Sequence, residues 1–157
     1  MNTRYVMVSF LLATAILSIS LPINTALSAP MVMQEEISGN VTYITGGVGE
    51  TEAAVMRDMA KDYLLEVSFI QKQRGQPEEF LANIKVQIQD DQQNTVLDIT
   101  TDGPFLLANL PQGHYLVIAE HKGEVKQQKV SIDIKKHQKM IFNWPVVEQS
   151  ETGAATE

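Results

Sequence analysis

Three histidines and the acidic residues near them are the first candidates for chemistry in this chain. His121 and Glu124 have the H-x-x-E spacing with which zinc peptidases hold their metal, but this pair falls across a predicted hairpin turn. Such a site needs a third ligand. His114 lies seven residues from His121, roughly 23 Å away along an extended strand, and His137 follows a further predicted strand. The pair is therefore interpreted as a chance match, and no metal and no cofactor are predicted.

Two other polar segments have the composition of ligand-binding loops but lack the spacing. The glycines of residues 46–49 precede a predicted helix, without the G-x-G-x-x-G pattern or the Gly-Lys-Ser/Thr ending of a phosphate loop. Asp90, Asp91 and Asn94 offer oxygen ligands suited to calcium, without EF-hand spacing. Paired Glu78 and Glu79 fall in an apparent loop. With no cysteine and no G-x-S-x-G elbow either, the chain is predicted not to be an enzyme.

Alternation of apolar and polar residues predicts short strands along most of the chain, most clearly over residues 84–88. Turn-forming residues separate the runs, as in residues 90–94 and in Lys122-Gly123. The expected strands cover residues 41–45, 65–69, 84–89, 95–100, 105–110, 115–120, 125–134 and 139–144. Strands joined in series by tight turns predict a mainly β fold, an antiparallel Greek-key sandwich of seven or eight strands.

One short helix is expected before the second strand. Val55, Met59 and Tyr63 recur at four-residue spacing, which is typical of one face of a helix over residues 50–63. Glu50 and Glu52 fall in its first turn, where the helix dipole favours negative charge. The surface of this helix and the loops at one end of the sandwich are the candidate binding regions.

Large aromatic side chains near the expected strand ends suggest a second kind of binding. Exposed rings stack on sugars or on a partner chain, whereas core packing is the competing interpretation, since aromatic residues are usually buried. The candidate binding surface consists of Met56, Met59, Tyr63 and Trp144.

The N-terminal segment has the layout of a signal peptide. Arg4 is the only charge before Glu35, an apolar run extends to about Ile23, and small residues follow. The alternative is an uncleaved anchor, because the run is at the short end for a spanning helix. Cleavage near residue 29 would remove Arg4 and leave the nineteen acidic residues in excess over the eleven remaining basic ones. A field of this sign disfavours duplex nucleic acid and anionic lipid as partners.

A motif in the second half of the chain resembles a known family. The block Asp102-Gly103-Pro104-Phe105, followed by residues 110–115 with Leu-Pro-Gln-Gly-His-Tyr and then Val117 and Ala119, is similar to the carboxypeptidase regulatory-like domain. This resemblance implies a transthyretin-like sandwich of seven strands and no peptidase activity. It also implies a tight turn at Pro111 and Gly113 and a corner role for Tyr115, whose hydroxyl would bond to the backbone.

Together these observations predict four segments. They are a signal peptide (residues 1–29), a linker (30–38), the sandwich domain (39–146) and a disordered acidic tail (147–157). Because the chain has an export signal and no cysteine, we expect a small exported bacterial protein that is periplasmic or secreted. The predicted function is a non-enzymatic binding or accessory module of the cell envelope, with an envelope protein as partner. The alternative is a carbohydrate-binding module with a glycan ligand. The membrane is met only transiently, through the signal peptide.

Overall fold

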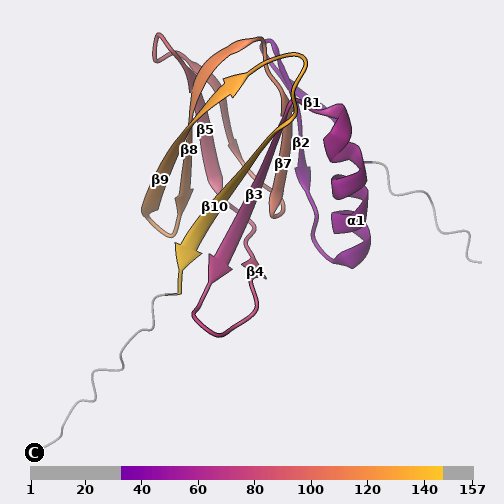
Figure 1. The fold of residues 1–157 in the computed structure, drawn as a ribbon, viewed down its shortest axis with the longest axis vertical. Helices are drawn as coiled ribbons and strands as arrows, with labels where there is room; N and C mark the ends of the chain where they lie inside the picture. Colours follow the sequence, from indigo (N-terminus) through magenta and orange to yellow (C-terminus); the bar gives the residue numbers. More distant parts are fainter. Residues whose placement is uncertain (1–32, 147–157) are drawn as a thin grey trace, which may run out of the picture. The chain divides into compact units, whose positions relative to one another are not determined.

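The computed structural model describes residues 33–146, which fold into two β-sheets and one short helix (Figure 1). The first sheet has the strand order β1-β2-β7-β3-β10, with β4 paired to β3, and the second has the order β6-β5-β8-β9. The strands are β1 (Glu36–Ser38), β2 (Val41–Gly46), β3 (Leu65–Lys72), β4 (Glu79–Phe80), β5 (Lys85–Asp90), β6 (Thr95–Thr100), β7 (Phe105–Asn109), β8 (Gly113–His121), β9 (Glu124–Ile132) and β10 (Gln138–Pro145). The predicted mainly β sandwich with one short helix is confirmed.

The described part has ten strands rather than seven or eight, because β1 and β4 are additional short strands. β1 forms inside the segment expected to be a linker, where Ile37 pairs with Thr42. β4 pairs with β3 at Ile70 and Gln71, beyond the point where β7 has left the ladder. Both strands complete the backbone hydrogen bonding of the first sheet.

One pairing departs from the expected antiparallel arrangement. β10 runs parallel to β3, with Phe142 opposite Phe69, instead of forming a hairpin ladder with β9. The chain crosses between the sheets after β9 and thereby brings three aromatic rings together inside the sandwich. The ring centroid of Phe142 lies 6.0 Å from that of Phe69 and 6.1 Å from that of Trp144, and both distances are within the range of favourable aromatic pairs.

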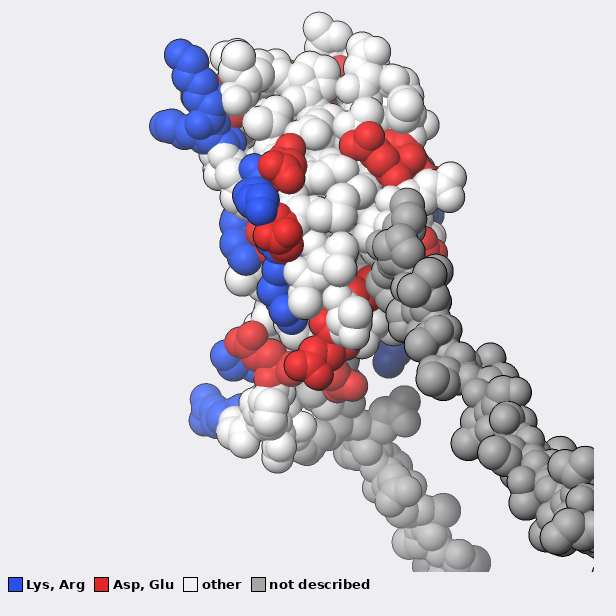
Figure 2. All heavy atoms as spheres, turned by 90° about the vertical axis from the view of Figure 1, so that its right-hand side faces the viewer, with Lys and Arg blue, Asp and Glu red and all other residues white. Residues whose placement is uncertain are grey.

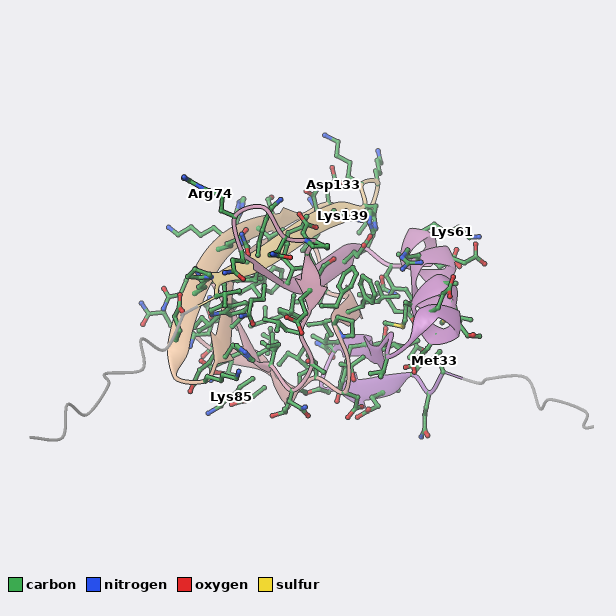
Figure 3. The ribbon with its side chains drawn as sticks, turned by 90° about the horizontal axis from the view of Figure 1, so that it is seen from below. Met33, Lys61, Arg74, Lys85, Asp133 and Lys139 are labelled. Atoms are coloured by element: carbon green, nitrogen blue, oxygen red, sulfur yellow. The ribbon has the colours of Figure 1, made fainter. Side chains whose placement is uncertain are left out.

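The core follows directly from the period of two in the strands. Val86, Ile88, Val117 and Leu106 point between the two sheets and are fully buried, while their sequence neighbours point outward. Seen from below, the side chains fill the space between the two layers (Figure 3).

Helix α1 (Glu50–Met59) covers the outer side of the first sheet over β2 and β7 (Figure 1). A second apolar cluster forms there, in which Met56 packs with Ile44 and Leu107. The helix ends four residues earlier than predicted, because Ala60–Asp62 form a 3₁₀ turn and Tyr63 is already extended. No helix of the described residues is long and apolar enough to span a membrane.

Candidate functional site

The predicted binding surface is inside the protein, which corrects that expectation. Met56, Tyr63 and Trp144 are at most 6% exposed, and Met59 packs half-buried against the helix cluster. The two methionines and Tyr63 fill the layer between α1 and the sheet, and Trp144 fills the space between the sheets. The indole Nε1 of Trp144 donates a hydrogen bond to the backbone carbonyl of Glu124 at 3.2 Å.

The carbohydrate-binding alternative loses its aromatic platform for the same reason. Tyr43, Tyr63 and Tyr115 are each at most 8% exposed, like Trp144. Among the described residues, Phe80 is the large aromatic side chain that is more than half exposed. Its ring lies against Phe105, 5.4 Å between centroids.

The H-x-x-E pair closes the β8–β9 hairpin, with His121 opposite Glu124 in the ladder. The His121 ring meets the edge of Trp144 at 5.7 Å between centroids. Burial, with Lys122 nearby, lowers the pKa of His121 below its usual value. Within residues 33–146, no group of three histidine or acidic side chains is placed to hold a metal ion.

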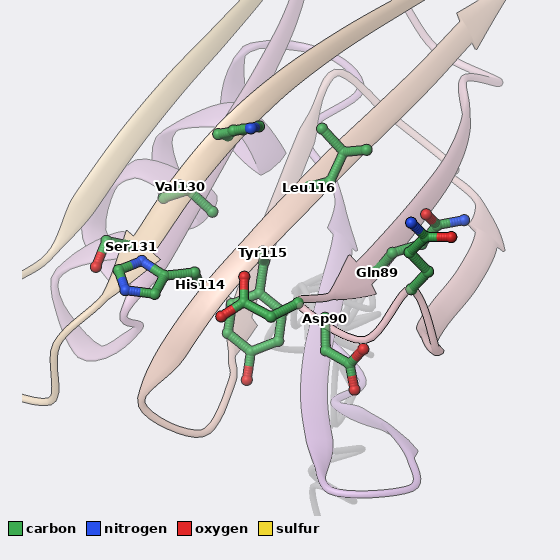
Figure 4. A pocket seen from close by; sticks show the side chains of 10 residues that line it. Gln89, Asp90, His114, Tyr115, Leu116, Val130 and Ser131 are labelled. Carbon is green, nitrogen blue, oxygen red and sulfur yellow. The ribbon is translucent and has the colours of Figure 1, made fainter.

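The loops at one end of the sandwich border a group of hollows in the described surface. Three adjoining hollows share Asp90 and Tyr115, and the largest has a volume of about 690 Å³. It lies over the outer side of β5, β8 and β9 (Figure 4). The β1–β2, β5–β6 and β7–β8 turns border the other two hollows. This is the candidate functional site, and it is hereafter called the end hollow.

Strand register determines which side chains face the end hollow. Leu116 on β8 pairs with Gln89 on β5 and with Lys129 on β9, so these three form one row across the sheet. His114 and Ser131 form the next row. Because Tyr115 and Val117 point inward, these rows point outward. The hollow therefore has an apolar centre at Leu116 and a rim of hydrogen-bonding groups.

Asp90 holds the turn that borders the end hollow. Its Oδ1 accepts the backbone N–H groups of Gln92 at 2.9 Å and Asn94 at 2.8 Å, and its Oδ2 accepts the side-chain amide of Asn94 at 3.0 Å. These hydrogen bonds, led by the one from the Asn94 side chain, lower the pKa of Asp90. Both carboxylate oxygens are used within the turn. This agrees with the interpretation of residues 90–94 as a turn rather than a calcium loop.

Tyr115 fixes the opposite border of the end hollow. Its hydroxyl donates a hydrogen bond to the carbonyl of Pro111 at 2.8 Å, and burial, followed by Asp90 and Asp91, raises its pKa. This is the backbone bond expected of a corner tyrosine. Gly113 does not adopt a positive φ, so the β7–β8 turn does not depend on the backbone conformation that favours glycine.

Asp102 and Gly103 lie before β7, away from the Pro111 turn that follows it, and hold the chain against β2. Thr45 Oγ1 donates to Asp102 Oδ2 at 3.0 Å. A Cβ on Gly103 would collide with the backbone of Gly46, so this close approach requires glycine. Asp102 and Gly103 therefore shape the sandwich and do not line the end hollow, whereas Pro111, Gly113 and Tyr115 of the same motif do.

Sequence reasoning missed a buried carboxylate on the outer side of β3. Glu66 is 5% exposed, and it pairs with Lys139 Nζ at 2.8 Å and His137 Nε2 at 3.3 Å. His137 Nδ1 lies 2.7 Å from the carbonyl oxygen of Tyr63. Alternation with Leu65 and Val67 marks Glu66 as outward-facing, which it is. No signal in the sequence showed that this outer face is covered.

Comparison with known families gives one match. Residues 75–157, more than half of the chain, match the family model of the β-sandwich domain of ER membrane protein complex subunit 7. The chain therefore belongs to this family. No curated protein matches the sequence.

This match corrects one prediction and leaves another open. The family is described from a complex of the ER membrane, so the predicted bacterial periplasmic or secreted location is wrong. Absence of cysteine, on which that prediction was based, is compatible with more than one compartment. The match supports a β-sandwich, and the finer resemblance to the carboxypeptidase regulatory-like domain stays a prediction. The predicted signal peptide and acidic tail lie outside the described residues.

Proposed function

Since the chain belongs to the family of the β-sandwich domain of ER membrane protein complex subunit 7, we propose that it is a non-enzymatic accessory module that binds a protein partner within a membrane protein complex. Family membership is the observation that carries the proposal, because the family is described as a subunit of a complex. The N-terminal segment, with its signal-peptide composition, would direct such a module to the lumenal side of the ER membrane.

The end hollow is the docking surface that we propose for this partner. Its turns are held in place by the bonds of Asp90 and by the Tyr115–Pro111 hydrogen bond. A surface that is already ordered loses little conformational entropy on binding. Leu116 supplies an apolar centre, and Gln89, His114 and Ser131 surround it. An apolar centre with a polar rim is the usual arrangement of a protein interface.

Substitution of Leu116 tests this proposal. Leu116→Arg places a charge at the centre of the end hollow, where a partner would have to bury it unpaired. The tagged full chain, expressed in cells of its own source, should recover membrane-complex subunits in stoichiometric amount after mild detergent extraction. We expect Leu116→Arg to reduce that recovery by about tenfold or more, as for the loss of a central interface residue.

Val48→Arg is the matched control, because Val48 is 59% exposed in the loop before α1, outside the hollow. It should leave the recovery of membrane subunits unchanged. Thermal denaturation of each variant separates lost binding from lost folding. The proposal fails if wild-type protein recovers no stoichiometric membrane partner, or if both variants recover the partner as well as the wild type does.

A further inference from the structure

The last segment of the sandwich, which includes β9 and β10, is basic, although the whole chain has a formal net charge of −7. Half of the twelve basic residues occur in residues 122–146, and this range contains two acidic residues. These basic residues are Lys122, Lys126, Lys129, Lys135, Lys136 and Lys139. Both acidic groups are engaged locally: Glu124 pairs with Lys126 at 3.2 Å, and Asp133 Oδ1 accepts the backbone N–H of Lys135 at 3.0 Å. The local excess of positive charge is therefore not neutralised within residues 122–146.

The two strands of this segment, β9 and β10, are edges of different sheets. β9 ends the second sheet and β10 ends the first, so each has an edge outside the ladders. Two hydrogen bonds join them at one end, from Trp144 Nε1 to the Glu124 carbonyl at 3.2 Å and from Gln128 Nε2 to the Ile141 carbonyl at 2.8 Å. Past Gln128 the strands leave a hollow of about 420 Å³, which the turn at residues 133–136 closes. This hollow is hereafter called the β9–β10 groove.

The β9–β10 groove is lined mostly by polar side chains, among which lysines outnumber acidic groups. Val130 and Met140 are its apolar residues, Lys129, Lys136 and Lys139 stand around it, and Asp133 is the acidic residue of its lining. In Figure 3, Asp133 and Lys139 lie at the same margin of the sandwich, on the side away from Lys85. Figure 2 shows lysine and arginine side chains gathered along one edge of the described surface.

The three lysines around the groove differ in whether an acidic group pairs with them. Lys139 pairs with the buried Glu66 at 2.8 Å. Lys129 and Lys136 have no acidic group within ion-pair distance among the described residues 33–146. Two ammonium groups beside Val130 and Met140 therefore remain available, and their complement is a pair of carboxylates that flank an apolar side chain.

We propose that the β9–β10 groove binds an extended acidic segment of a partner protein. The segment lies along the free edge of β9 and adds backbone hydrogen bonds to it, as in other cases of strand addition. One apolar side chain rests on Val130 and Met140, and neighbouring carboxylates reach Lys129 and Lys136. The open part of β9, from Gln128 to Ile132, accommodates about five extended residues, or ~17 Å.

The shape of the site favours a peptide chain over a lipid surface. A membrane surface needs cations that project together from a convex face, whereas Lys129 and Lys136 border a hollow between two strands. Unpaired strand edges are also sites where another chain adds as a strand. This inference goes beyond docking at the end hollow, with which the groove shares Lys129, Val130 and Ser131 of β9. Its test needs no membrane complex and uses Lys136, which lines the groove and not the end hollow. Failure of either proposal can therefore be recognised separately.

Titration of the purified protein with a short acidic peptide tests the inference. The probe is a capped pentapeptide of sequence Glu-Glu-Leu-Glu-Glu. Its binding is measured at low salt from the NMR shifts of the backbone amides of the protein. Two comparison peptides replace either all four glutamates by glutamine or the leucine by serine. We expect saturable shifts confined to residues 128–132 and 136–140, weaker binding of both comparison peptides, and weakening by salt.

Charge-matched variants provide the control. Lys129→Gln with Lys136→Gln should weaken binding by about tenfold or more, since both charge partners of the peptide are lost. Arg74→Gln with Lys85→Gln removes the same charge from exposed positions outside the groove and should leave the affinity unchanged. Circular dichroism confirms that each variant is folded.

Three results would overturn the inference. The first is no saturable binding of the acidic peptide, and the second is equal weakening by the two double variants, which would indicate a general charge effect. The third is lysine-dependent binding to vesicles with anionic lipid but not to the peptide, which would identify a membrane surface as the ligand of this patch.

Discussion

At the residue scale, single side chains of this protein have roles that depend on how closely the backbone packs. Asp90 and Tyr115 each use their polar group to fix a turn at the end hollow, and Gly103 allows the chain to lie close to Gly46 of β2. Glu66 is a buried carboxylate whose partners, Lys139 and His137, come from the far end of the chain. The residues that remain available for binding are less conspicuous in the sequence: Leu116, Lys129 and their neighbours.

Gly103 gives the sharpest prediction at this scale. Gly103→Ala should destabilise the protein by about 1–3 kcal/mol, because the added Cβ meets the backbone of Gly46 and overpacking of this kind forces the backbone to move. Urea denaturation measures the effect.

Gly113→Ala is the control for this substitution. A Cβ at Gly113 would lie 3.5 Å from the Tyr115 side chain, an ordinary contact, and Gly113 has no positive φ. Its stability should change by less than about 0.5 kcal/mol, as at tolerant positions. Equal losses for the two alanines would contradict the close approach of Gly103 and Gly46.

At the element scale, α1 and β1 are held to the sandwich through Tyr63. Its ring packs under the helix, and its hydroxyl donates to Glu35 Oε1 at 2.9 Å, just before β1. Burial, followed by this hydrogen bond, raises the pKa of Tyr63 to about 12. Met56 and Met59 lie in the same layer, so the face of the helix that carries them is a structural cover of the sheet.

This raised pKa predicts a specific alkaline behaviour. Because the folded state favours the protonated phenol, its contribution to stability is complete below the ordinary tyrosine pKa of 10.0 and is lost as pH rises toward about 12. Tyr63→Phe should therefore flatten the fall of the free energy of unfolding between pH 10 and 12. It should also remove the highest step in a tyrosinate absorbance titration. An unchanged titration would mean that the fold does not raise the pKa of Tyr63.

At the scale of the whole molecule, the sandwich was predictable and its surfaces were not. Strands such as residues 84–89 are visible in the sequence because one face is buried and the period is two. The parallel pairing of β10 with β3 joins residues about seventy positions apart, and no local pattern encodes it. The predicted exposure of the candidate binding residues was wrong for the same reason, because α1 and the crossing of β10 bury them.

The loops at one end of the sandwich were one of two predicted binding regions, and the end hollow that we propose lies there, but its residues were not predicted. Leu116 and His114 alternate with core residues, and this alternation does not distinguish them from any other solvent-facing position on a strand. Their row with Gln89 and Lys129 exists only after three strands are in register. The predicted location was wrong because signal-peptide composition indicates export without naming the membrane that is crossed.

Site-specific photo-crosslinking from the end hollow tests the central claim most directly. A photoreactive amino acid would replace Leu116 in the full chain in one sample and Val48 in the other, followed by crosslinking in intact membranes and mass spectrometry. If this protein is an accessory module docked through the end hollow, the probe at position 116 crosslinks to one dominant membrane-complex subunit and the probe at position 48 does not. A dominant partner captured equally from both positions, or from neither, would contradict the account.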